Sequence, residues 1–125
     1  MDIGERIFSS LTTSTVITTI IGNRIYPSIV PQGSTWPCVT YQMTDDERIM
    51  SLSGYTGLRH PTIQIDCYAV NYTAAKDLAT KTSTTLLNTT YFRAILTSEI
   101  DTVEHLNDET LLNRISITAS CWYQE

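Results

Sequence analysis

The sequence predicts a single α+β domain over residues 1–125, with a mixed, mainly antiparallel sheet, helices packed on one sheet face and a long projecting hairpin. Three observations lead to this fold class. Apolar and polar residues alternate along 62–70 and 115–123, the period of a strand with one buried face. Residues 73–87 repeat apolar positions at helical spacing, and 45–57 are polar with two glycines. This mixture of strands and helices is typical of an α+β sandwich.

Two helices are expected before residue 22. Asp2 can cap the first, and Glu5 three residues later completes a capping box. Apolar residues then fall on one face of each helix. They are Ile3, Ile7, Phe8 and Leu11 in the first, and Val16, Ile17, Ile20 and Ile21 in the second. Gly22 ends the second helix, because glycine adopts the left-handed backbone that closes helices.

The next segment is expected to consist of strands and a loop. A short strand occupies 24–26, prolines hold 28–37 as a loop, and a second strand occupies 38–43. The polar segment 45–57 then forms the far end of the projecting hairpin.

The clearest strand is 62–70, which should bury one row of side chains and present the other. The core row is Ile63, Ile65, Cys67 and Ala69, and the opposite row is Gln64, Asp66 and Tyr68. A helix over 73–87 connects it to a strand at 91–96. Strands joined by a helix are usually parallel neighbours through a right-handed crossover, so we expect this pair to lie side by side. A turn at 107–108 precedes the last strand, 115–123.

The charge distribution argues against tight binding of nucleic acid or of an anionic membrane. The formal net charge is −5, and the eight Lys and Arg residues are spread singly. A phosphate-binding surface would gather them in a patch. Acidic residues cluster instead, at 45–47 and between 99 and 109. Because signal-peptide features and membrane-length apolar runs are missing, we expect a soluble protein made in a cytoplasm.

The sequence contains no arrangement that predicts catalysis. His60 and Cys67 would lie on one strand, roughly 23 Å apart and on opposite faces, so they cannot act together. Three cysteines without CxxC spacing are expected to be buried thiols. No GxGxxG, P-loop, GxSxG or HExxH motif occurs. We therefore expect no enzyme activity, no cofactor and no metal.

Aromatic and charged residues indicate contacts with other subunits. Tyr and Trp are enriched at interfaces because they bury area while keeping a polar handle, although they also line cores. For Tyr68 and Trp122 both interpretations remain open. Asp66 is expected to pair with an Arg of this chain or of a neighbour. The candidate interface residues are Asp45, Asp46, Glu47, Arg48, Tyr55, Arg59, Asp66, Tyr68 and Trp122.

Several short motifs, taken in order, resemble the phage tail completion family, which includes tail terminators and tail-to-head joining proteins. The family typically shows an "RIYP" strand, a "PQG" loop, a "P-x-V-x-Y" strand and later a "GL-R…Q-D-x-A" strand followed by a helix. The matching segments are NRIYP at 23–27, VPQG at 30–33, WPCVTY at 36–41, GLR at 57–59, IQIDCYA at 63–69 and AKDLA at 75–79. The resemblance runs over nearly the whole chain, whereas the acidic stretch 99–109 departs from the pattern.

The resemblance implies a virion protein that is assembled in the host cytoplasm and caps the head-proximal end of a tail tube. Relatives form six-membered rings, stop tube polymerisation and provide the surface that docks to the head. The implied partners are further copies in a hexameric ring, the tail tube protein and the head connector or stopper protein. DNA would pass through the ring without tight binding.

The residues agree with this implication. A ring needs a heterologous interface, and the hairpin at 45–57 is well suited to reach a neighbour. Six copies, each with a charge of −5, carry −30 in total, and an acidic lumen repels DNA phosphates. We hypothesise that Asp45, Asp46 and Glu47, or the arm at 99–109, face the bore or the adjoining ring. The alternative is that both segments are solvated loops.

Two other functions remain open from the sequence. One is a head–tail connector or another minor tail component. The other is a small ligand-binding or enzymatic α+β domain, which would have a deep pocket with convergent polar groups and would be a stable monomer.

Overall fold

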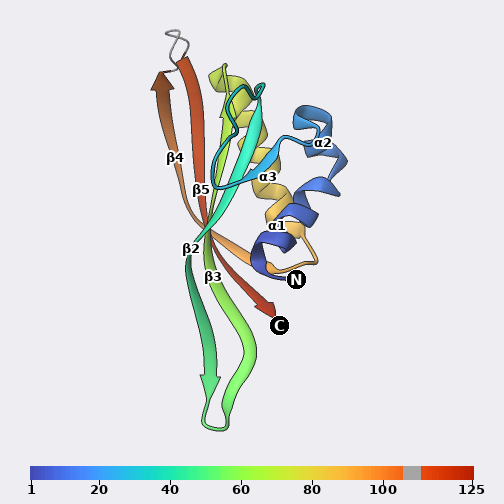
Figure 1. The fold of residues 1–125 in the computed structure, drawn as a ribbon, viewed down its shortest axis with the longest axis vertical. Helices are drawn as coiled ribbons and strands as arrows, with labels where there is room; N and C mark the ends of the chain where they lie inside the picture. The colour runs from blue at the N-terminus through green and yellow to red at the C-terminus, as the bar shows by residue number, and fades with distance from the viewer. Residues whose placement is uncertain (106–110) are drawn as a thin grey trace.

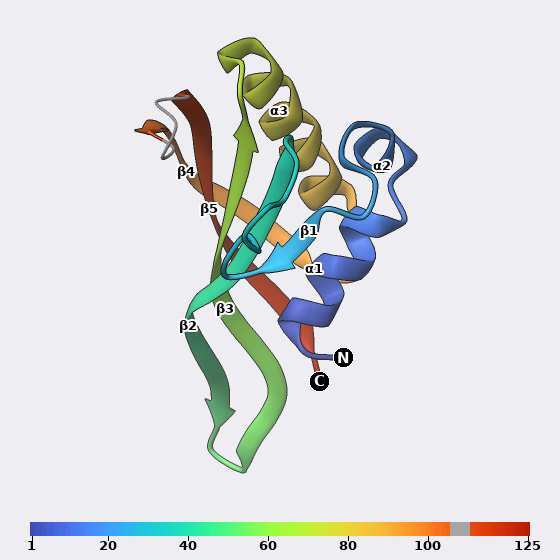
Figure 2. The ribbon, with the colours of Figure 1, turned by 45° about the horizontal axis from the view of Figure 1, so that its top comes forward.

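In a computed structural model, which describes residues 1–105 and 111–125, three helices cover one face of a five-stranded sheet (Figures 1 and 2). The turn expected at 107–108 lies outside the described residues. The elements are α1 (Ile3–Thr12), α2 (Thr15–Ile21), β1 (Ile25–Pro27), β2 (Cys38–Ser51), β3 (Gly54–Ala69), α3 (Tyr72–Asn88), β4 (Arg93–His105) and β5 (Leu111–Gln124). The predicted fold class is confirmed.

The strand order is β1-β2-β3-β5-β4, with β1 and β2 parallel and the other neighbours antiparallel. The prediction that the strands at 62–70 and 91–96 are neighbours is therefore wrong, because β5 lies between β3 and β4. Alternate side chains of β5 from Ile115 to Tyr123 are all buried, so this strand takes an interior position with a ladder on each side. The more exposed β4 is left at the edge.

Helices α1 and α3 bury apolar side chains against the sheet, and α2 packs against these two helices. Asp2 caps α1 as expected, since its Oδ1 accepts the Glu5 backbone N–H at 2.8 Å. The predicted core rows of β3 and β5 are buried. Two positions were predicted wrongly: Phe8 and Val16 are exposed, because each lies beside the contact line of its short helix. Small residues of α3, such as Ala75 and Ala79, let this helix lie close to the sheet.

Strands β2 and β3 form the projecting hairpin, which extends well beyond the helical layer (Figure 1). Their ladder runs from the Cys38–Tyr68 pair to the Ser51–Gly54 pair at the tip. The tip differs from the expected polar loop. Met50 and Leu52 are exposed there, and the chain carries no charged residue between positions 48 and 59. An apolar tip of this kind favours contact with another protein surface.

Candidate assembly surfaces

A network of charged side chains fixes the base of the hairpin to the end of β5. The Arg59 guanidinium forms an ion pair with Asp46 and lies 2.6 Å from Glu125 Oε1. The Tyr55 hydroxyl donates to Glu125 Oε2 at 2.9 Å. We call Asp46, Tyr55, Arg59 and Glu125 the hairpin-base network. These hydrogen bonds, first that from Tyr55 and then that from Arg59, hold the pKa of Glu125 below its usual range.

Main-chain contacts reinforce this network. The Glu125 backbone N–H donates to the Gly57 carbonyl at 2.7 Å, and the Gln124 side-chain Nε2 donates to the Thr56 carbonyl at 3.1 Å. The predicted residues Asp46, Tyr55 and Arg59 thus meet in one place. Sequence reasoning missed Glu125, which lies 66 residues after Arg59 and belongs to no local pattern.

The three acids at 45–47 do not act as one cluster. In the β2–β3 ladder Asp45 faces Thr62 and Glu47 faces His60, whereas Asp46 faces Pro61. Because successive side chains of a strand alternate, Asp45 and Glu47 lie on the sheet face without helices, and Asp46 lies on the other. Asp46 is neutralised by Arg59, while neither Asp45 nor Glu47 has an ion-pair partner among residues 1–105 and 111–125.

The sheet face without helices is polar and carries a buried carboxylate. Asp66 is 7% exposed and accepts hydrogen bonds from Ser116 Oγ at 2.6 Å and Gln64 Nε2 at 3.1 Å. Its partners in this chain are therefore a hydroxyl and an amide, where an arginine was expected. A pairing with a neighbouring copy stays a prediction.

Aromatic rings line the same face in two pairs. The Tyr68 ring lies 5.8 Å from the Trp36 ring, and burial raises the pKa of the Tyr68 phenol. The Trp122 ring stacks on His60 with 4.1 Å between centroids. His60 Nδ1 lies 2.8 Å from the Cys121 carbonyl, which requires the Nδ1–H to donate. All four rings are half-buried, so each still has surface to offer a partner.

Strand β4 forms a 13-residue sheet edge with exposed Ile95, Ile100 and Val103. Three of its acids form ion pairs with two cations of the chain. Lys76 of α3 pairs with Glu99 at 3.1 Å and Asp101 at 2.9 Å, and Arg114 pairs with Glu104 at 2.6 Å. The described part of the acidic arm at 99–109 is therefore less negative than its sequence indicates, and positions 106–110 lie outside the described residues.

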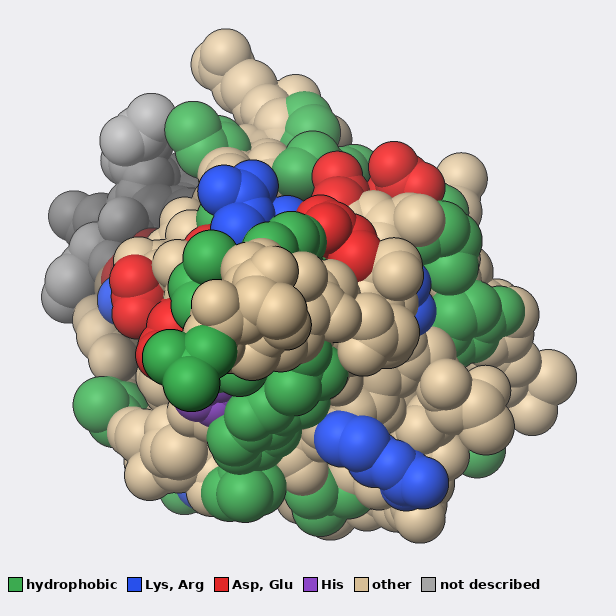
Figure 3. Space-filling model, turned by 90° about the horizontal axis from the view of Figure 1, so that it is seen from below, with side chains coloured by type: hydrophobic (Ala, Val, Ile, Leu, Met, Phe, Trp, Pro, Cys, Tyr) green, Lys and Arg blue, Asp and Glu red, His purple; other side chains and the backbone are tan. Residues whose placement is uncertain are grey.

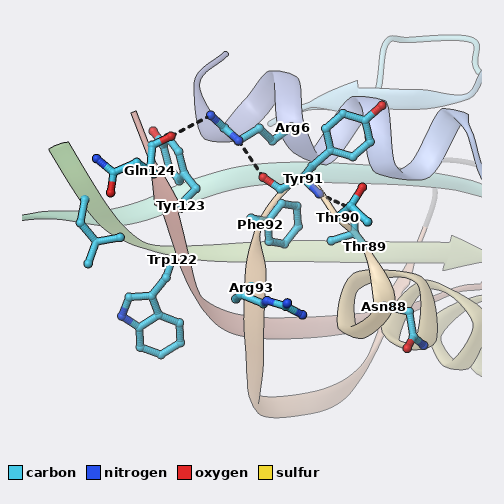
Figure 4. A pocket seen from close by; sticks show the side chains of 11 residues that line it. Arg6, Asn88, Thr89, Thr90, Tyr91, Phe92, Arg93, Trp122, Tyr123 and Gln124 are labelled. Carbon is cyan, nitrogen blue, oxygen red and sulfur yellow. Dashed lines mark hydrogen bonds between the residues drawn. The ribbon is translucent and has the colours of Figure 1, made fainter.

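A hollow of about 500 Å³ lies at the hairpin base between α1, the α3–β4 connection and the end of β5 (Figure 4). Arg6 is held there by main-chain groups, donating to the Tyr91 carbonyl at 2.7 Å and the Gln124 carbonyl at 3.2 Å. Its guanidinium also lies over the Tyr123 ring at 4.3 Å. No Asp, Glu, His or Cys is among the described residues lining this hollow.

The three cysteines are buried free thiols, as expected. Burial raises the pKa of Cys38, Cys67 and Cys121 to about 12, which keeps them protonated and unreactive. Within the described part of the chain, no group of three His, Cys, Asp or Glu side chains could hold a metal ion. Among the described helices, none is long and apolar enough to cross a membrane.

The chain is similar to known proteins over nearly its whole length. The model of the family described as "Tail completion protein gp17" matches residues 5–124. A chain in the solved structure "Virion of native gene transfer agent (GTA) particle" superposes with a TM-score of 0.66 at 14% sequence identity. That superposition covers 98% of this chain and 95% of the other. The search among curated proteins found no match.

Proposed function

Because the chain belongs to the tail completion protein gp17 family, we propose that it closes the head-proximal end of a tail tube as a hexameric ring. Membership makes it a structural component of a tailed-phage virion. In the proposed role the ring stops tube polymerisation and presents the surface to which the head connector or stopper protein docks. Its other partners are the tail tube protein and the DNA that passes through.

The observation that carries this proposal is the hairpin that projects beyond the body of the domain. The hairpin-base network holds it, and its tip exposes Met50 and Leu52. Seen from the tip, that end of the molecule presents hydrophobic and acidic side chains close together (Figure 3). A lone two-stranded hairpin is marginally stable in water, so a fixed hairpin with an apolar tip supports contact with another subunit.

The distribution of unpaired acids supports a bore lined by the sheet face without helices. Asp45 and Glu47 lie on this face without ion-pair partners among the described residues, whereas Asp46 is neutralised by Arg59. Between them and β4 the face is rich in hydroxyl side chains, including Thr118 and Ser120. Hydroxyl groups carry no positive charge to hold DNA phosphates, and the acids of six copies would repel them.

The test of the proposed role is electron microscopy of particles made without this protein. Loss of a terminator should give tails of uncontrolled length, because nothing stops polymerisation. Loss of a connector should give tails of normal length that are separate from heads. Normal, head-bearing tails in the absence of the chain would contradict both roles.

The test of the bore is the variant Asp45→Asn, which removes one carboxylate per copy from the sheet face without helices. We expect an unchanged melting temperature and a reduced yield of infectious particles, because DNA would pass a less repulsive lumen. The Asp77→Asn variant on α3 is the matched control, since it removes one charge from the helical layer. Equal infectivity of both variants and the unmodified chain would contradict the bore assignment.

A further inference from the structure

Four side chains form a row across the sheet face without helices. Arg93 of β4 is the ladder partner of Trp122 in β5, and Glu47 of β2 is the ladder partner of His60 in β3. The stacked rings of His60 and Trp122 join the two halves at 4.1 Å. We call Arg93, Trp122, His60 and Glu47 the cross-sheet row. It begins with a cation on one strand and ends with an anion on another, at the same level of the sheet.

Both ends of this row lie on open sheet edges. Strand β4 is the last strand in the sheet order. On the other side, β1 pairs only with the Val39–Tyr41 part of β2, so the outer edge of β2 at Glu47 has no neighbour among the described residues. Open edges present unpaired N–H and C=O groups that favour pairing with another strand. Each edge therefore offers backbone hydrogen bonds together with one terminal charge.

Neither terminal charge of the row takes part in the ion pairs near these edges. Lys76 pairs with Glu99 and Asp101, Arg114 pairs with Glu104, and Arg59 pairs with Asp46, whereas Asp45 and Arg48 of β2 form no ion pair among the described residues. Arg93 and Glu47 have no ion-pair partner within residues 1–105 and 111–125. Three strand spacings, roughly 14 Å, separate the strands that carry them, so they cannot pair within one chain.

We propose that the β4 edge of one copy docks against the β2 edge of the next, with Arg93 of one copy meeting Glu47 of its neighbour. This inference rests on the proposed ring and names the contact that builds it. Opposite charges on opposite edges make a heterologous, head-to-tail interface. Because both charges lie at one level of the sheet, successive copies join without an axial step, as a closed ring requires.

Charge exchange tests the contact in tails assembled in cells where the variant replaces the unmodified chain. Each single reversal, Glu47→Arg or Arg93→Glu, should lower the amount of this protein on tails about tenfold, because like charges then meet at every interface. The double variant should restore it, because the pair is re-formed with exchanged signs. The matched control reverses the exposed Asp77–Lys81 pair of α3, singly and together, and should change nothing. Normal single variants, or a double variant that stays defective, would overturn the inference.

A disulfide test asks the same question without relying on charge. The variant with both Glu47→Cys and Arg93→Cys should give a ladder of cross-linked multimers when assembled tails are treated with diamide. Each single variant should give none beyond dimers, and the buried native cysteines should not contribute. Absence of a ladder, or a cross-link to a different tail protein in its place, would overturn the contact between copies. If removing the chain gives tails of uncontrolled length while both tests fail, the proposed function stands and this interface does not.

Discussion

Replacing Arg59 by methionine isolates the contribution of the hairpin-base network. Methionine keeps most of the apolar stem and removes the guanidinium, which leaves Asp46 without its ion-pair partner. The side chains of Arg59 and Asp46 are 14% and 17% exposed. Breaking a fully buried pair costs about 3–5 kcal/mol, whereas exposed pairs contribute about 0–1 kcal/mol. For this largely shielded pair we expect a loss of about 2 kcal/mol in the free energy of unfolding.

For a domain of this size, that loss should lower the melting temperature by about 8 °C, at roughly 4 °C per kcal/mol. The assay is thermal unfolding followed by circular dichroism, combined with hydrogen exchange of the hairpin amides. Exchange should accelerate most at positions 46–59, because the network holds this segment to β5.

The neighbouring Arg48→Met variant is the control for this prediction. Arg48 is exposed, faces Arg59 in the ladder and has no ion-pair partner among the described residues. Its replacement should change the free energy of unfolding by less than about 0.5 kcal/mol, as is usual at exposed sites. Equal effects of the two variants would refute the assignment of hairpin stability to the network.

Three other predictions concern single groups. Because the pKa of Glu125 is lowered in the folded state, its ionised carboxylate stabilises the fold above the ordinary pKa of 4.5, and this stabilisation should be lost as pH falls through the lower folded pKa. Hydrogen exchange of the hairpin amides, measured against pH, should show this loss. The Glu125→Gln variant should abolish the pH dependence. Ser116→Ala should cost about 1–2 kcal/mol in chemical denaturation, because buried Asp66 loses a donor at 2.6 Å, whereas Ser120→Ala should be nearly neutral. The three cysteines should resist a thiol reagent in the native state and react on unfolding; fast labelling of the folded protein would contradict their burial.

Much of the fold could be predicted from the sequence because burial imposes a period. The alternation in β3 and β5 correctly separated the core residues from the opposite face, and the Asp2 cap marked the start of α1. Periodicity carries no information about which strand lies beside which. The position of β5 between β3 and β4 depends on how much of each strand can be buried, and local alternation does not encode this.

The candidate site was harder to predict because its residues are distant in sequence. Asp46, Tyr55 and Arg59 were selected for charge or aromatic character, but their common partner Glu125 joins them through tertiary structure. The hairpin tip was expected to be polar because the segment 45–57 is polar overall and holds two glycines. Its most exposed side chain is nevertheless Leu52, and exposure at a turn cannot be read from composition.

The rigidity of the hairpin links stability to assembly. Ordering a flexible arm on binding costs free energy, and a binding surface that is already fixed avoids this cost. The hairpin-base network fixes the arm before any partner arrives, and on β2 it lies directly beside Glu47 of the cross-sheet row. Arg59→Met should therefore weaken the proposed contact between copies even though Arg59 lies on the opposite sheet face. The double-cysteine variant measures this effect directly, because cross-linking on tails should fall when Arg59→Met is added and should be unchanged when Asp77→Asn of α3 is added. Equal cross-linking in both backgrounds would show that the interface does not depend on a fixed hairpin.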